Sequence, residues 1–172
     1  MSIRFRGHRA NAMRQDYLLR LIEQLRQFVR EMVRLREAGE HDAAVFTIVP
    51  AQEKLFGLPA HQVALLTLDE QFQHLVQGES PTMAWDKCCA YAELLEELGH
   101  IYVAKGDPES SIGAYRFALH ILLLAAAQHP AHAPKDFAHR VTRLRTLLEG
   151  HALPGAVNDL FSAADEAGLL GD

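Results

Sequence analysis

Apolar side chains recur at helical spacing along most of the chain. From Arg14 to Ala38 they occupy one face of a long predicted helix, three and four residues apart. The apolar positions of this face are Leu18, Leu21, Ile22, Leu25, Phe28, Val29, Met32 and Leu35. Gly39 ends this helix, and a second helix is expected from Asp42 to Phe56. No segment alternates apolar and polar residues as a strand would, so the sequence predicts an all-α fold.

The middle of the chain predicts two long helices joined by a tight turn. Ser80-Pro81 is a good helix start, and the first of the two helices is expected to run from Pro81 to Lys105. Gly106 supplies the left-handed residue that ends it, and Asp107 caps the next helix. Further helices are expected after Gly57-Leu58-Pro59, from the Thr67–Glu70 capping box to near Gly78, from Pro134 to Glu149, and from Pro154 to Ala167.

The central hairpin resembles a tetratricopeptide repeat. The residues that match the repeat pattern are Leu95, Leu98, Gly99, Tyr102, Gly106, Ser111, Tyr115 and Ala118. We expect Gly99 and Ala118 to let the two helices approach closely, and Tyr102 and Tyr115 to fill the wedge between them. The chain departs from the pattern at Ser111, which is polar where Ala is usual, and in its delayed closing proline, Pro130.

A turn like that at Gly106 is also found at Gly39, about two repeat lengths earlier, although the helix before Gly39 lacks the Leu-Gly-x-x-Tyr signature. The sequence therefore predicts antiparallel helical hairpins stacked as a short tetratricopeptide-like (α-α superhelix) array with extra capping helices. Residues 14–170 are expected to form this single domain. Residues 1–13 are expected to be a flexible or non-native N-terminal arm, with Met13 as a natural start.

Two motifs are similar to an uncharacterised bacterial helical family, a domain of unknown function whose second half looks tetratricopeptide-like. One is Met13-Arg-Gln-Asp-Tyr17, followed by Ile22-Glu23-Gln24, and the other is the hairpin from Gly99 to Leu119. The resemblance covers residues 13 to about 148. It implies the helical fold, and it implies no activity, because the family has no assigned catalytic residues.

Charge is distributed unevenly along the chain, whose net charge is −5. Residues 1–36 hold nine Arg against three acidic residues, which is +6, and the remainder holds eight basic against nineteen acidic residues, which is −11. Such polarity favours self-association or a polarised partner surface. Arg26, Arg30 and Arg34 follow one another at four-residue spacing and form a candidate basic interface. The alternative partner of this candidate basic interface is the phosphate backbone of a nucleic acid, but no nucleic-acid-binding motif accompanies these arginines.

The first helix of the central hairpin provides a candidate partner groove. Its residues are Glu93, Glu96, His100, Val103 and Ala104, on the face that lines the concave side in tetratricopeptide repeats. An acidic, partly apolar groove suits a basic or amphipathic peptide, whereas it would repel a terminal carboxylate. The alternative is that the C-terminal helices fill this groove with their own apolar face.

Catalytic and metal-binding patterns are weak in this sequence. Ten histidines are present, among them His129-x-x-His132, but the ligand spacings of zinc sites are missing. Glu93, Glu96 and Glu97 are interpreted as an exposed acidic face rather than an acid/base pair. Hence we expect neither an enzyme nor a metal or cofactor.

The two cysteines, Cys88 and Cys89, are adjacent, which suits a reducing cytoplasm better than a structural disulfide. No run approaches the roughly 18 apolar residues of a membrane span. The sequence therefore predicts a cytoplasmic, non-catalytic scaffold or adaptor domain that binds a basic or amphipathic peptide or itself, as a homodimer. The alternative is a nucleic-acid-associated or regulatory helical module that uses the Arg-rich N-terminal helix.

Overall fold

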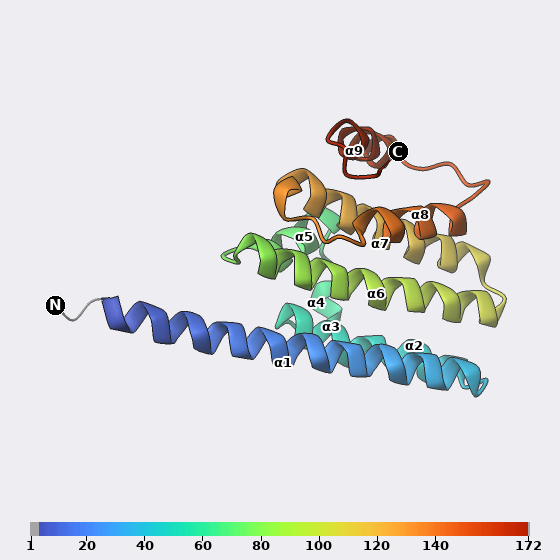
Figure 1. Ribbon diagram of the computed structural model, residues 1–172. Coiled ribbons are helices and arrows are strands. Elements are labelled where there is room, and N and C mark those ends of the chain that lie inside the picture. The colour runs from blue at the N-terminus through green and yellow to red at the C-terminus, as the bar shows by residue number, and fades with distance from the viewer. Residues whose placement is uncertain (1–3, 172) are drawn as a thin grey trace.

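The computed structural model describes the backbone of residues 4–171 and the side chains of residues 9–171, and every regular element in this range is a helix (Figure 1). The predicted all-α class is thus confirmed. The elements are α1 (Arg4–Glu37), α2 (His41–Phe46), α3 (Ile48–Phe56), α4 (Ala60–Val63), α5 (Leu68–Val76), α6 (Pro81–Lys105), α7 (Pro108–Gln128), the 3-10 helix η1 (Pro130–His132), α8 (Phe137–Leu147) and α9 (Gly155–Glu166).

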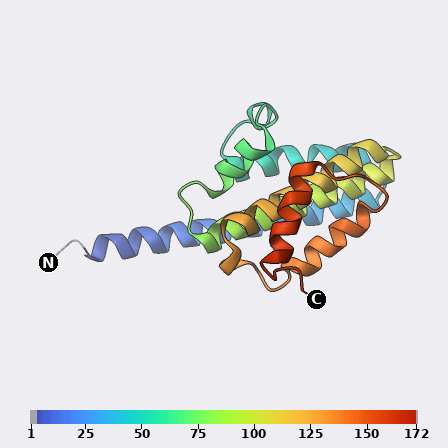
Figure 2. The same ribbon diagram turned by 90° about the horizontal axis from the view of Figure 1, so that it is seen from above.

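The helices stack in the order α1, α6, α7, with α8 and α9 against α7 (Figure 1). Helices α6 and α7 make the most extensive contact of the molecule. The short helices α2 and α3 return along α1, and α5 packs on α6. Seen from above, the first part of α1 extends beyond the other helices (Figure 2).

Local capping explains the bounds of the central hairpin. The Ser80 hydroxyl accepts a hydrogen bond from the Met83 N–H at 3.3 Å, and the Asp107 carboxylate accepts one from the Ser110 N–H at 3.1 Å. Between the helices Gly106 has φ +74°, the left-handed conformation that glycine adopts without strain. These predicted features are confirmed, as is the capping box of Thr67 and Glu70 at the start of α5.

Two helix bounds differ from the predicted ones. The helix predicted from Asp42 to Phe56 is divided at Thr47 into α2 and α3. Because Pro50 has no N–H to donate, the carbonyl of Phe46 loses its helical partner. The first helix begins at Arg4 rather than Arg14, so ten residues assigned to an N-terminal arm continue α1. No proline interrupts them, and a helix can therefore propagate through this stretch.

The core is continuous along the stack and reaches its greatest depth between α6 and α7. Its largest fully buried side chains are Tyr91, Phe137, Leu25, Met32, Leu75, Leu94, Ile101, Leu119, Ile121, Leu122, Leu123 and Leu144. Gly99 of α6 faces the ring of buried Tyr115 so closely that a Cβ on Gly99 would lie 2.6 Å from Tyr115 Cδ1. Ala118 and Leu95 are also buried, whereas Leu98 and Tyr102 are half-buried. The expected close approach of the two helices at Gly99 is confirmed.

Helix α7 is long enough and apolar enough to cross a membrane when only its length and composition are considered. The window that meets this test has a mean hydropathy of 1.4, and 56% of the window is buried inside the protein. This finding corrects the expectation that no stretch approaches a membrane span. A core helix passes the same test, and α7 packs against α6, α8 and α9.

Candidate functional site

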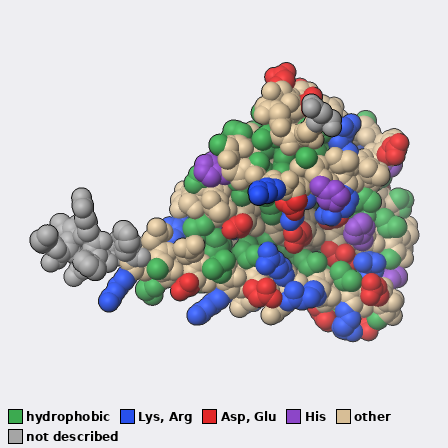
Figure 3. Space-filling model, in the orientation of Figure 1, with side chains coloured by type: hydrophobic (Ala, Val, Ile, Leu, Met, Phe, Trp, Pro, Cys, Tyr) green, Lys and Arg blue, Asp and Glu red, His purple; other side chains and the backbone are tan. Residues whose placement is uncertain are grey.

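A polar cavity of about 340 Å³ lies where α1, α6 and α8 meet. Helix α6 supplies the acidic side of the cavity and α8 supplies its arginines. The lining residues are Val29, Glu93, Glu96, Glu97, His100, Asp136, His139, Arg140 and Arg143. Acidic, basic and histidine side chains interleave on the face that carries these helices (Figure 3). We call these nine residues the polar cavity.

Each carboxylate that α6 contributes to the polar cavity is paired with an arginine of another helix. Arg140 Nη1 donates to Glu93 at 2.7 Å, and Arg36 Nε donates to Glu97 at 2.6 Å. Arg143 binds both carboxylate oxygens of Glu96, at 2.7 and 2.8 Å. Arginine and carboxylate geometries match in such a two-point contact. The expected exposure of this acidic face is wrong for Glu96 and Glu97, which are buried, and the face is largely neutralised from within the protein.

His100 links the ion pairs to the α6–α7 interface. Its Nδ1 lies 2.8 Å from the Tyr115 hydroxyl, and its Nε2 lies 3.7 Å from Glu96 Oε1. Burial raises the pKa of Glu96, but hydrogen bonds with His100 and Arg143 outweigh this effect, so the pKa of Glu96 lies below its ordinary value. Burial raises the pKa of Tyr115 to about 12, with a further contribution from Glu96. Tyr115 is thus neutral at physiological pH.

Three of the five residues of the candidate partner groove line the polar cavity: Glu93, Glu96 and His100. Val103 and Ala104 are exposed farther along α6, and Val103 keeps 58% of its surface in solvent. The sequence interpretation missed Arg140 and Arg143. Their spacing of three residues on one helix was a signal that they share a face, but it did not indicate which acidic residues they meet.

The candidate basic interface is also partly neutralised within the protein. Arg30 pairs with Glu23 at 2.9 Å, and Arg34 makes two contacts to Glu31, at 2.7 and 2.8 Å. Arg26 instead lines a smaller cavity of about 110 Å³. Asp86 lies in the same cavity, where burial raises its pKa and Arg26 partly offsets this. Exposed ion pairs on one helix are weak, but they lower the net positive charge that a phosphate would meet.

Another part of α1 exposes two large apolar side chains. Met13 keeps 73% of its surface exposed and Tyr17 keeps 65%. Half-buried Phe28 lies on the same side of the helix, eleven residues (about three turns) beyond Tyr17. There it borders a groove of about 370 Å³ that α1 forms with Thr47 and Lys54. We call Met13, Tyr17 and Phe28 the α1 stripe.

Arg14 marks the place where α1 leaves the rest of the protein. Its guanidinium donates to the Gly78 carbonyl at 2.7 Å and lies 3.3 Å from the Glu79 carboxylate. From this anchor toward its C-terminal end α1 packs on α6, whereas residues 9–13 are all exposed. The segment of α1 before Arg14 is ten residues long. Isolated helices shorter than about 12–15 residues are marginal in water unless their apolar side is covered.

The cysteines form no reactive or metal-binding centre in the part of the chain that the structure describes. Both thiols are free; Cys88 is buried and Cys89 is half-buried. Burial raises the pKa of Cys89 to about 11, and it raises the pKa of Cys88 further. Within residues 9–171, no three His, Cys, Asp or Glu side chains converge as metal ligands.

Comparison with known proteins gives one partial similarity. No family model matches the chain, and no solved structure matches it. Trans-aconitate 2-methyltransferase from Streptomyces avermitilis is 33% identical over 100 residues, which are 58% of this chain and 34% of that protein. The chain spans about a third of the length of this relative. The similarity assigns no role to a residue of the polar cavity or of the α1 stripe.

Proposed function

We propose that this protein is a non-catalytic interaction module that self-associates through the α1 stripe. The observation that carries the proposal is the exposure of Met13 and Tyr17, which lie on either side of the Arg14 anchor from which α1 extends beyond the other helices (Figure 2). Large apolar side chains on an uncovered helix are a common feature of protein interfaces. The finer architecture that we propose is a short tetratricopeptide-like array, in the cytoplasm, related to the bacterial helical family of similar sequence.

The internal ion pairs favour the α1 stripe over the polar cavity as the partner surface. A basic peptide would have to displace Arg140 and Arg143 from Glu93 and Glu96 before it could bind there. Breaking such partly buried pairs is costly because it leaves charges unpaired. The α1 stripe needs no such rearrangement.

Charge polarity supports a second copy of this chain as the occupant. The N-terminal part of the chain is positive and the remainder is negative, so one copy offers both surfaces that a dimer would bring together. Arg9 and Arg20 flank the exposed apolar positions on α1, and both are exposed. Burying them against acidic residues of a second copy would bring opposite charges together at the rim of the apolar contact.

The expected loss of dimer stability is large enough to be measured. Full burial of a large apolar side chain is worth about 1.5–3 kcal/mol. Changing both Met13 and Tyr17 to Ser should therefore weaken the dimer at least about a hundredfold. Leu65, which is 81% exposed on the α4–α5 connection, provides a matched control for the loss of an exposed apolar side chain.

The experiment measures molar mass by light scattering after gel filtration, from low micromolar to about 100 µM. We expect wild type and Leu65→Ser to exceed the 19.2 kDa of one chain at high concentration. Met13→Ser/Tyr17→Ser should remain at 19.2 kDa throughout. Wild type that elutes only as a 19.2 kDa particle, or a double variant that dimerises like wild type, would refute self-association through this surface.

The second candidate function is nucleic-acid association through α1, and the exposed Arg9 and Arg20 favour it. Binding to phosphates weakens steeply with salt, whereas an apolar contact does not. A fluorescence-anisotropy titration of a labelled DNA or RNA oligonucleotide at two salt concentrations separates the two. Arg9→Gln/Arg20→Gln should abolish salt-dependent binding if phosphates are the partner.

A further inference from the structure

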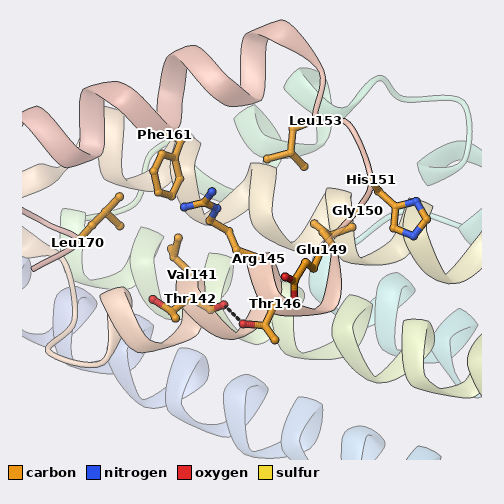
Figure 4. Close-up of a pocket in the computed structure, with 11 residues that line it drawn as sticks. Val141, Thr142, Arg145, Thr146, Glu149, Gly150, His151, Leu153, Phe161 and Leu170 are labelled. Atoms are coloured by element: carbon orange, nitrogen blue, oxygen red, sulfur yellow. Dashed lines mark hydrogen bonds between the residues drawn. The ribbon is translucent and has the colours of Figure 1, made fainter.

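A cavity of about 470 Å³ lies between α8 and α9 and is separate from the polar cavity and from the α1 stripe. Buried Val141 of α8 and buried Leu148, which follows the last residue of α8, line it. Half-buried Leu153, Phe161 and Leu170 come from the following loop, from α9 and from the C-terminal segment (Figure 4). A volume of this size is in the range of small-molecule sites.

Arg145 adds an exposed positive charge to a lining that also includes the polar side chains of Thr142, Thr146 and His151. Its guanidinium carbon lies 4.3 Å from the centre of the Phe161 ring, a stacking contact that fixes the direction of the side chain (Figure 4). None of the ion pairs among residues 9–171 involves Arg145. Its donors are therefore available to a ligand that enters the cavity.

Glu149 lies four residues beyond Arg145, exposed in the turn that follows α8, and it lines the same cavity. It makes no ion pair with Arg145 or with another cation in the described range. The two charges thus line the same cavity without an ion pair between them. A ligand with a carboxylate would find its partner in Arg145. If it also carries an ammonium group, Glu149 is the partner for that group.

The loop between α8 and α9 closes the cavity, and a hydrogen bond from α7 holds this loop in place. Arg116 of α7 donates from Nη2 to the Ala152 carbonyl at 2.6 Å, and this bond joins the α8–α9 connection to the core helix. Ala152 lies between His151 and Leu153, which both line the cavity. Arg116 is thus a positioning residue for this wall.

We propose that the cavity between α8 and α9 binds a small carboxylate joined to an apolar group. The carboxylate accepts hydrogen bonds from Arg145, and the apolar group packs on Val141, Leu148 and Leu153. Two kinds of molecule offer this chemistry: a simple carboxylic acid and an apolar α-amino acid. They differ in the ammonium group, which Glu149 would attract.

The test uses two probes with the same apolar group, 4-methylpentanoate and leucine, which is its 2-amino derivative. Binding to the full-length chain is followed by amide chemical-shift changes in NMR titrations. We expect saturable shifts of α8 and α9 amides for at least one probe. Arg145→Gln should weaken this binding about tenfold to a hundredfold, because a charge-assisted hydrogen bond is lost. Arg30→Gln removes the same charge on an exposed part of α1 and should leave the binding unchanged.

Glu149→Gln identifies the kind of ligand. It should strengthen binding of 4-methylpentanoate by removing a repulsive charge, and it should weaken binding of leucine by removing the ammonium partner. The proposal is overturned if neither probe gives saturable shifts up to about 10 mM, which is weaker than the usual range of specific sites. It is also overturned if Arg145→Gln binds like wild type, or if 4-methylpentanamide binds as well as the carboxylate. A circular-dichroism melt confirms that each variant is folded.

Discussion

Replacing Gly99 by Ala tests the packing between α6 and α7. A Cβ at this position would lie 2.6 Å from Tyr115 Cδ1 and 2.8 Å from Cζ, and closer still to Cε1. Tyr115 is buried, so its ring cannot move aside into solvent. Displacing it would also break the 2.8 Å hydrogen bond between its hydroxyl and His100 Nδ1.

The expected change in the free energy of unfolding combines one stabilising effect and two destabilising effects. Alanine gains about 1 kcal/mol over glycine in a helix interior. Overpacking a tight core costs about 1–3 kcal/mol, and a lost hydrogen bond costs about 1 kcal/mol more. We expect Gly99→Ala to lower the free energy of unfolding by about 1–3 kcal/mol. For a chain of this length each kcal/mol corresponds to about 2–4 °C in Tm.

Gly113 provides the matched control. It also lies inside a helix, α7, but no atom approaches within 4 Å of a Cβ built there. Gly113→Ala should therefore stabilise the protein by about 0.5–1 kcal/mol. Urea unfolding followed by circular dichroism measures both variants. Equal stability of Gly99→Ala and Gly113→Ala would refute the close packing of Gly99 on Tyr115.

Two further predictions concern titratable groups. The pKa of Glu96 is lowered in the folded state, so its stabilising contribution is present above its unfolded pKa and is lost as pH falls through the folded value. Urea midpoints from pH 7 down to pH 3 should thus fall less steeply for Glu96→Gln than for wild type; parallel profiles would contradict the role of Arg143 and His100. Because the pKa of Cys89 is about 11, its thiol should react with iodoacetamide at pH 8 at least about a hundredfold more slowly in the folded protein than in urea. Mass spectrometry of the alkylated chain measures both rates, and similar rates would show that the thiol is not protected.

The sequence was most informative where the signal was local. Ser80, Asp107 and the Thr67–Glu70 pair cap helices through atoms at most three residues away, so residue types and spacing were sufficient to predict them. The same is true of the all-helical class, which follows from the period of the apolar positions. Gly99 was identified because it matches the glycine of the tetratricopeptide pattern, where two helices approach closely.

The candidate site was predicted only in part. Glu93, Glu96 and His100 were correctly placed on one face of a helix, since three- and four-residue steps bring side chains together. What the sequence did not indicate was their partners, because Arg140 and Arg143 follow them by 47 residues. Only the packing of α8 against α7 brings those guanidinium groups to α6.

The amino-acid sequence by itself thus determined the all-helical class, the caps of α5, α6 and α7, and the helix face on which the polar groups of α6 lie. Tertiary structure decided which charges neutralise one another and which surfaces remain uncovered. It paired the acidic face of α6 with Arg36, Arg140 and Arg143, and it left Met13 and Tyr17 exposed on α1. The physical reason is the separation along the sequence of the residues that interact. Helix formation and capping act within about one turn, whereas the pairing of buried charges depends on where distant helices pack.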